Sequence, residues 1–333
     1  HIVPWNYPMQ IIGRSVGAAL AMGNAIILKP AEEACLTALA FADIARESGI
    51  PKGALNVVPG FGEEAGASLS SHSGINHISF TGSVKVGSLV QAAAARNVVP
   101  VTLELGGKSP QIVFEDANLN NALPFLVNAG IQNAGQTCSA SSRILVHESI
   151  YDNVSRMMAK KYEALIVGSA IDDLDVGPLI SERQKNIVCG FIKDGRDLVK
   201  VAEGNIAQNV NNKGYFVLPT LFGKVPSNHK LAQEEIFGPV QTLIPFKDED
   251  EAIAIANGTD YGLVASIWTN DGSRQMRLAK KIDTGQVFIN NYGAGGGVEL
   301  PFGGVGKSGH GREKGFEALY GFSKLKTVAA YHG

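Results

Sequence analysis

The 333-residue sequence contains only three cysteines, widely separated at positions 35, 138 and 189. Thiols so far apart form neither a disulfide framework nor the closely spaced ligand set of a structural zinc site. Their scarcity excludes a small disulfide-stabilised scaffold and a zinc-binding module. It also indicates a reducing compartment, so we expect a cytoplasmic protein without a metal.

Long apolar runs are also missing. The longest, residues 16–28, is interrupted by Asn24 and ends before Lys29, so it is too short to span a membrane. Lys and Arg number 29 against 31 Asp and Glu, which provides no basic surface for nucleic acid or an anionic membrane. The opening residues, HIVPWNYP, resemble the middle of a protein, so we expect an N-terminal portion to precede His1.

Strand and helix patterns alternate through the first hundred residues. Such alternation predicts an α/β fold with a parallel sheet and helices on its faces. The apolar runs predict strands within 24–30, 54–60, 75–82 and 101–107. The amphipathic segments predict helices over 9–23, 32–49, 63–72 and 83–96.

A second α/β domain is expected after Gly107. Its predicted strands lie in 110–115, 142–147, 262–269 and 285–291, and its predicted helices in 119–133, 151–167, 183–195 and 248–257. The glycine clusters at 293–297 and 303–311 are interpreted as loops.

Two glycine motifs suggest phosphate binding. Gly304, Gly306 and Gly309 form a G-x-G-x-x-G pattern, but the short βαβ context of a dinucleotide fingerprint is absent. A P-loop is excluded because Pro301 occupies the position of its first glycine. The turn at Gly82 and Ser83 is better placed, since a strand leads there into a helix. A phosphate contact and a plain tight turn both remain open.

Three polar residues stand out as candidates for chemistry. Cys138 lies among small polar residues and is either a nucleophile or a buried thiol, whereas Cys35 and Cys189 fall in helical patterns and are interpreted as structural. Glu104 interrupts an apolar strand end beside two glycines, where a carboxylate would face the crevice beyond a parallel sheet. Asn6 is an oxyanion donor or a turn former.

Taken together, several segments resemble the NAD(P)-dependent aldehyde dehydrogenase superfamily in its hydrolytic, non-phosphorylating branch. They occur in the family's order and spacing: PWNYP (4–8), KPAE (29–32), FTGSVKVG (80–87), LELGGKSP (103–110), GQTCSASSR (135–143), EEIFGPV (234–240) and LPFGGVGKSGHGRE (300–313). The resemblance implies a Rossmann-type cofactor domain over 1–106, to which 308–320 returns. It also implies a catalytic domain over 107–307 and an oligomerisation strand over 321–333.

By this resemblance, Cys138 is the nucleophile that forms a thiohemiacetal and then a thioester, Asn6 holds the oxyanion and Glu104 is the general base for hydrolysis. The presence of Glu104 favours release of a free acid. The implied cofactor residues are Lys29, Glu32, Gly82, Ser83, Glu235, Phe237 and Trp5. The carboxylate of Glu32 favours NAD, with NADP possible, because it repels a 2′-phosphate. Tyr7 and Phe302 are expected to line the substrate pocket, and the glycine-rich loop 291–299 to leave it roomy.

Three rival interpretations accompany this one. A coenzyme A-acylating relative would not depend on Glu104, a catalytically silent fragment or binding protein would bind little NAD, and a cysteine hydrolase would act without cofactor. The expected partners are a small aldehyde and further copies of the chain in a homodimer or homotetramer, with no nucleic acid and no membrane.

Overall fold

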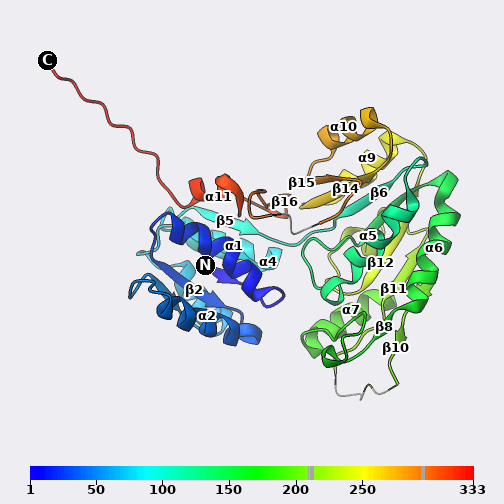
Figure 1. The fold of residues 1–333 in the computed structure, drawn as a ribbon, viewed down its shortest axis with the longest axis horizontal. Helices are drawn as coiled ribbons and strands as arrows, with labels where there is room; N and C mark the ends of the chain where they lie inside the picture. The colour runs from blue at the N-terminus through cyan, green and yellow to red at the C-terminus, as the bar shows by residue number, and fades with distance from the viewer. Residues whose placement is uncertain (209, 211–213, 294–296) are drawn as a thin grey trace. The chain divides into compact units, whose positions relative to one another are not determined.

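The computed structural model describes residues 1–208, 210, 214–293 and 297–333. The described residues form two compact units, each with its own sheet (Figure 1). Unit 1 lies within His1–Glu104, Gly296–Gly303 and Gly309–Gly333, and unit 2 within Leu105–Gly295 and Gly304–Ser308. Part of the predicted loop 291–299, residues 294–296, lies outside the described residues.

Unit 1 is built on a six-stranded sheet with the order β17-β5-β4-β1-β2-β3. Strands β1 to β5 run parallel, and β17 joins β5 antiparallel at the edge. The strands are β1 (Ile2–Val3), β2 (Ile26–Pro30), β3 (Leu55–Val57), β4 (Ile78–Thr81), β5 (Val101–Glu104) and β17 (Gly309–His310). The chain returns to the middle of the sheet between β3 and β4, so its winding reverses between β1 and β4.

The helices of unit 1 cover this sheet with apolar side chains. Helix α1 begins at Pro8, whose fixed φ suits a first helical position, and it buries Ile11, Ile12 and Val16 in a cluster that includes Leu28. The helices are α1 (Pro8–Ala21), α2 (Cys35–Glu47), α3 (Ala67–Ser70), α4 (Val84–Ala95) and α11 (Gly315–Gly321).

Unit 2 contains a seven-stranded sheet with the order β15-β14-β6-β7-β12-β11-β9. All neighbours are parallel except β9, which pairs antiparallel with β11. Its strands are β6 (Pro110–Val113), β7 (Arg143–His147), β9 (Val199–Glu203), β11 (Thr220–Gly223), β12 (Val240–Phe246), β14 (Val264–Trp268) and β15 (Gln286–Ile289). Two small sheets pair β8 (Ile166–Val167) with β10 (Asn205–Ile206), and β13 (Tyr261–Gly262) with β16 (Val305–Gly306).

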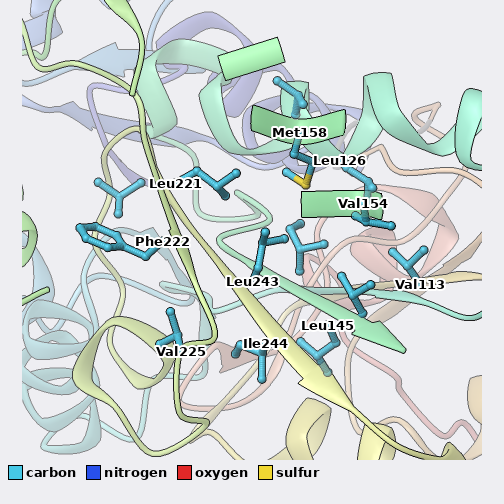
Figure 2. Close-up of a cluster of buried hydrophobic side chains, with 14 of the residues drawn as sticks. Val113, Leu126, Leu145, Val154, Met158, Leu221, Phe222, Val225, Leu243 and Ile244 are labelled. Atoms are coloured by element: carbon cyan, nitrogen blue, oxygen red, sulfur yellow. The ribbon is translucent and has the colours of Figure 1, made fainter. Parts of the chain in front are cut away.

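The core of unit 2 forms where its helices pack on this sheet. Figure 2 shows Met158 and Val154 of α6 and Leu126 of α5 beside strand residues such as Leu145 and Leu243. Because all five side chains are almost completely buried, the hydrophobic effect fixes the sheet against these helices. The helices are α5 (Leu119–Ile131), α6 (Tyr151–Ala164), α7 (Glu182–Asp194), α8 (Lys230–Gln233), α9 (Glu249–Asn257) and α10 (Gly272–Lys281).

The predicted fold class is confirmed, with local differences. The glycine-rich segment 303–311 was expected to be a loop but contributes β16 and β17, because its backbone completes two sheet edges. Helix α10 was missed, because most of its residues are polar or charged and only Leu278 is buried. Cys189, which was interpreted as structural within an apolar helical pattern, lies exposed on α7. Among the described residues, none of the helices has the length and apolar character to span a bilayer.

Candidate active site

The predicted site residues of unit 1 gather at one edge of its sheet. Asn6 follows β1, Lys29 lies at the end of β2, Gly82 follows β4 and Glu104 ends β5. These strands are parallel, so their carboxyl ends lie at the same edge. The crevice beyond that edge, where the winding reverses between β1 and β4, is where open α/β sheets bind ligands.

Two of the predicted cofactor residues are paired with each other. The Lys29 ammonium donates a hydrogen bond of 3.0 Å to the Glu32 carboxylate, and Lys29 is buried whereas the Glu32 side chain is 43% exposed. Although partial burial opposes it, the bond with Lys29 holds the pKa of Glu32 below its usual value. A fixed carboxylate that reaches solvent at the end of a parallel strand can accept hydrogen bonds from hydroxyl groups of a ligand.

The Gly82–Ser83 turn caps the helix that follows β4. The Ser83 hydroxyl accepts a hydrogen bond from the Val86 amide, and the Gly82 amide donates to the Glu104 carbonyl. The turn therefore joins the start of α4 to the end of β5. The unsatisfied amides of a helix N-terminus attract anions, which fits the predicted phosphate contact.

Glu104 is only 2% exposed, and neither carboxylate oxygen has a hydrogen-bond partner among the described residues. Burial and the nearby Glu313 carboxylate raise the pKa of Glu104 well above its usual value, although Arg14 and Arg312 oppose the shift. A carboxyl group held in this way ionises at higher pH than an ordinary carboxyl, and its ionised form is a stronger proton acceptor.

Glu313 and Arg14 form the charged surroundings of Glu104. The Arg14 guanidinium of α1 forms an ion pair with Glu313, which also accepts a hydrogen bond of 2.8 Å from the Ser79 hydroxyl. Phe302 exchanges two backbone hydrogen bonds with Glu313, and the Arg14 guanidinium lies 4.7 Å from the centre of its ring. Phe302 is thus an interior side chain of unit 1, and its role in a substrate pocket stays a prediction.

The segment between β1 and α1 holds the remaining predicted residues of unit 1. Trp5, Asn6 and Tyr7 are each half-buried, and Tyr7 packs against the apolar core that α1 covers. Their placement beside the carboxyl end of β1 agrees with a ligand-binding role, and each individual role stays a prediction.

In unit 2, Cys138 lies in the loop between α5 and β7. The loop begins with three consecutive residues at positive φ, namely Asn133, Ala134 and Gly135. Gln136 then fixes it in two directions, because its side chain donates to the Asn133 carbonyl and accepts from the Ile180 amide. The backbone just before the thiol is therefore fixed by hydrogen bonds of the Gln136 side chain.

The loop of Cys138 and the predicted cofactor residue Glu235 both meet the Gly106–Gly107 segment. The Gly107 amide donates to the Glu235 carboxylate at 3.0 Å. A Cβ added at Gly107 would lie 2.4 Å from the Cys138 carbonyl, and one at Gly106 would lie 2.3 Å from the Glu235 carboxylate. Glycine is thus required at Gly107, where a Cβ would meet backbone, and at Gly106 it lets the end of the Glu235 side chain approach closely. Burial raises the pKa of Glu235 to about 7.

Two buried cations lie beside this segment. The Arg143 guanidinium donates to the carbonyls of Lys108, Ile255 and Ala256, so it ties the start of β7 to its neighbours. The Lys108 side chain is 1% exposed, and burial together with the positive charge of Arg143 lowers its pKa to about 7. Arg143 therefore supports the backbone on this side of the segment, whereas the Lys108 ammonium has no hydrogen-bond partner among the described residues.

Substitution of Gly135 with alanine should destabilise the fold by about 2 kcal/mol or more. The residue has a φ of +73°, and its new Cβ would lie 2.2 Å from the backbone of Gly238. Gly190→Ala is the matched control, since no atom lies within 4 Å of its Cβ on α7, and it should stabilise the protein slightly. Urea unfolding of both variants measures the difference, and equal stabilities would contradict the close approach.

Several residues near the predicted site were not predicted from the sequence. Arg14, Ser79 and Glu313 surround Glu104, and Asn128, Gln132 and Tyr292 lie around a small pocket next to Cys138. The residues on the α5 side could have been found from their spacing, because Phe125, Asn128 and Gln132 are three and four residues apart on a predicted helix and so lie on one side of it. Glu313 gave no comparable local signal, because its side-chain partners Ser79 and Arg14 lie more than 200 residues away in the sequence.

Comparison with known proteins places these features in a family. The profile of the "Aldehyde dehydrogenase family" matches residues 1–328. The chain is 43% identical over 331 residues to mouse "Aldehyde dehydrogenase, cytosolic 1", covering 98% of this chain and 66% of that protein. A crystal structure of a candidate aldehyde dehydrogenase from Burkholderia cenocepacia has a TM-score of 0.99 and 60% identity, covering 100% of this chain and 70% of that one.

A second solved structure was determined with a ligand. The NAD+ complex of aldehyde dehydrogenase from Bacillus cereus has a TM-score of 0.94 and 39% identity, covering 98% of this chain and 66% of that one. The chain therefore spans about two thirds of the length of the curated relatives that it matches. The profile match over nearly the whole chain, with these identities, shows that the chain belongs to the aldehyde dehydrogenase family.

Proposed function

We propose that the protein oxidises an aldehyde to the carboxylic acid with NAD as cofactor, Cys138 as nucleophile and Glu104 as general base. The observation that supports this most directly is the buried carboxyl of Glu104, whose pKa is raised in a chain of this family. A structural role gives no reason to keep such a group, since an unpaired buried carboxyl is costly. A proton acceptor for the hydrolysis of a thioester is the use that fits it.

NAD fits the residues at the carboxyl edge of the unit 1 sheet. The Lys29–Glu32 pair offers a donor and an acceptor for ribose hydroxyls, and the start of α4 at Ser83 offers amides to a pyrophosphate. In unit 2, the Glu235 carboxylate is held by the Gly107 amide and can accept from the second ribose. NAD is preferred to NADP because the Glu32 carboxylate repels a 2′-phosphate. The NAD+ complex of the Bacillus cereus relative supports this assignment.

The first half of the reaction belongs to Cys138 and Asn6. The thiolate of Cys138 attacks the aldehyde carbonyl to form a thiohemiacetal, and the Asn6 amide with the Cys138 backbone N–H donates to its oxyanion. The fixed loop of Gly135 and Gln136 orients the thiol for this attack. Bound NAD supplies the hydride acceptor that the oxidation requires.

The second half belongs to Glu104. The acyl group that remains on Cys138 as a thioester is hydrolysed by a water molecule whose proton passes to the Glu104 carboxylate. Release of the free acid then restores the thiol. The test is a screen for NADH formation by the full-length protein with aliphatic, aromatic and charged aldehydes, and with NAD and NADP compared. Absence of NADH with every aldehyde would overturn the proposal and favour a silent binding protein.

The pH dependence of this hydrolysis should report on Glu313. Glu104 must be ionised to act as a base, so turnover should rise with pH through its raised pKa. Glu313→Gln removes a negative charge that raises this pKa, so the rising limb should move to lower pH by about half a unit or more. Exposed Glu317→Gln on α11 is the matched control and should leave the limb in place. If the rising part of the pH–rate profile did not move in Glu313→Gln, the Glu313 charge would not raise the pKa of Glu104.

A cytoplasmic location and self-association complete the proposal. The three cysteines are free thiols, and the mouse relative is named cytosolic. Leu325, Val328 and Tyr331 near the C-terminus are each more than 80% exposed. Exposed apolar residues along one extended segment are suited to pairing with a second copy, as the expected homodimer or homotetramer requires. Sedimentation of the protein with and without residues 322–333 tests this pairing.

A further inference from the structure

A small pocket of unit 2 opens next to the thiol-bearing loop. Thr137 and Ser139, which flank Cys138 in the sequence, contribute to its wall, together with Phe125, Asn128 and Gln132 from the α5 side and Tyr292 from the segment after β15. Its volume is about 90 Å³, space for roughly six to nine water molecules at about 10–15 Å³ each. An aldehyde captured by Cys138 could place a tail of a few non-hydrogen atoms there.

The side-chain amides of Asn128 and Gln132 reach the same pocket because their spacing places both residues on one side of α5 and the turn after it. Phe125, Asn128 and Gln132 are three and four residues apart, so they lie on one side of α5 and the turn that continues it. Leu126 and Val127 on another side of the helix are buried in the unit 2 core. The core therefore fixes the helix, and the Asn128 and Gln132 amides remain exposed to a ligand.

The facing wall is held in place by Tyr292. Its hydroxyl donates a hydrogen bond to the Ser139 carbonyl, and its ring lies 6.2 Å from that of Phe288. Burial raises the pKa of this phenol, so it stays neutral at physiological pH. Beside the hydroxyl-bearing residues Thr137 and Ser139, the wall presents the side-chain amides of Asn128 and Gln132, each of which can both donate and accept a hydrogen bond.

The lining of the pocket is uncharged and mainly apolar, and it includes the two primary amides of Asn128 and Gln132. Among the described residues that line it, none is Asp, Glu, Lys, Arg or His. An ionised tail would lose water without gaining a counter-charge, and a purely apolar tail would displace water from the two amides. A neutral tail that both donates and accepts a hydrogen bond matches primary amides best.

We propose that Asn128 and Gln132 are specificity-determining residues that select uncharged aldehydes with a hydroxyl or amide group a few atoms from the carbonyl. This inference rests on the proposed oxidation at Cys138 and adds the substrate class. The selection is exerted by hydrogen bonds that the amides make to the substrate tail, beyond the reacting carbonyl.

An isosteric pair of aldehydes tests the selection in the full-length protein. 3-Hydroxypropanal and butanal differ only by a hydroxyl in place of a methyl group, and 3-aminopropanal and 4-oxobutanoate supply a cation and an anion. We expect kcat/KM for NADH formation to be about 5- to 10-fold higher for 3-hydroxypropanal than for butanal, the discrimination of one or two hydrogen bonds. Both charged aldehydes should rank below it.

Substitutions then assign the preference to the amides. Gln132→Leu or Asn128→Leu should reduce the ratio of 3-hydroxypropanal to butanal to about 1, whereas Asn120→Leu, the same kind of change at an exposed position at the start of α5, should leave it unchanged. An unchanged ratio in both pocket variants, or a charged aldehyde as the best substrate, would overturn the inference. No Cys138-dependent NADH with any aldehyde would instead overturn the proposed function.

Discussion

Replacing Cys138 with alanine should lower the rate of NADH formation from any aldehyde by at least about 10³-fold. The oxidation depends on covalent capture of the aldehyde, and no other thiol can replace this one. Cys35 is half-buried at the start of α2 in unit 1, and Cys189 lies on the exposed surface of α7. Steady-state kinetics with saturating NAD measure the loss.

Two controls make this result specific. Cys189→Ala removes an exposed thiol and should keep full activity. NAD binding by Cys138→Ala, followed by protein fluorescence, should remain within a few-fold of the unsubstituted protein, because the proposed cofactor contacts lie at Lys29, Glu32 and Glu235. Retention of more than about a tenth of the activity in Cys138→Ala would exclude Cys138 as the nucleophile.

Replacing Glu104 with glutamine should separate acylation from hydrolysis. We expect an initial burst of about one NADH per active site, followed by a steady-state rate lowered by about 10²- to 10⁴-fold, the contribution of a general base. Rapid-mixing kinetics distinguish the two phases. An acyl-transferring enzyme would keep its coenzyme A-dependent turnover in Glu104→Gln, so a variant with full turnover would contradict the hydrolytic function.

The same substitution should stabilise the protein at neutral pH. Glu104 is buried without a hydrogen-bond partner among the described residues, and glutamine removes the ionisable group, a gain of about 1–3 kcal/mol. Because the folded state raises the pKa of Glu104, its carboxyl favours folding below the unfolded-state pKa and loses that contribution as pH rises through the folded-state pKa. The Tm difference between Glu104→Gln and the unsubstituted protein should therefore widen as pH rises from about 4.

Glu313→Gln is the opposing control for stability. It breaks the buried ion pair with Arg14, so it should lower the Tm although it also removes a carboxylate. If Glu104→Gln lowered the Tm at every pH as well, the Glu104 carboxylate would have a stabilising partner in the folded protein.

The fold class and most elements could be predicted from local pattern. Strand β2 and helix α1, for example, follow from an apolar run and from Pro8 ahead of an amphipathic segment. Helix α10 was not predicted, since most of its residues are polar or charged and only Leu278 is buried. The short strands β16 and β17 could not be predicted either, because they depend on pairing with distant residues.

Some residues of the candidate site could likewise be predicted from local sequence, and others could not. The positions of Glu104 and Cys138 at strand and loop ends could be inferred from polar residues that interrupt apolar or small-residue stretches. The groups that tune Glu104 could not, because Arg14 and Glu313 reach it only through the assembled sheet. The pocket at Asn128 and Gln132 requires knowledge of which side of α5 is buried, which periodicity alone did not supply.

Because β17 lies near the C-terminus, the sheet of unit 1 can be completed only late in synthesis. Strand β5 leaves the ribosome early, but its edge partner at Gly309 and the Glu313 carboxylate follow roughly 200 residues later, about 10–40 s at about 5–20 residues per second. Until then β5 has an open edge and Glu104 lacks the neighbour that raises its pKa. The first segment of unit 2, Leu105–Gly295, is thus synthesised while the edge of β5 is still open, so a chain that ends within it leaves that edge unpaired.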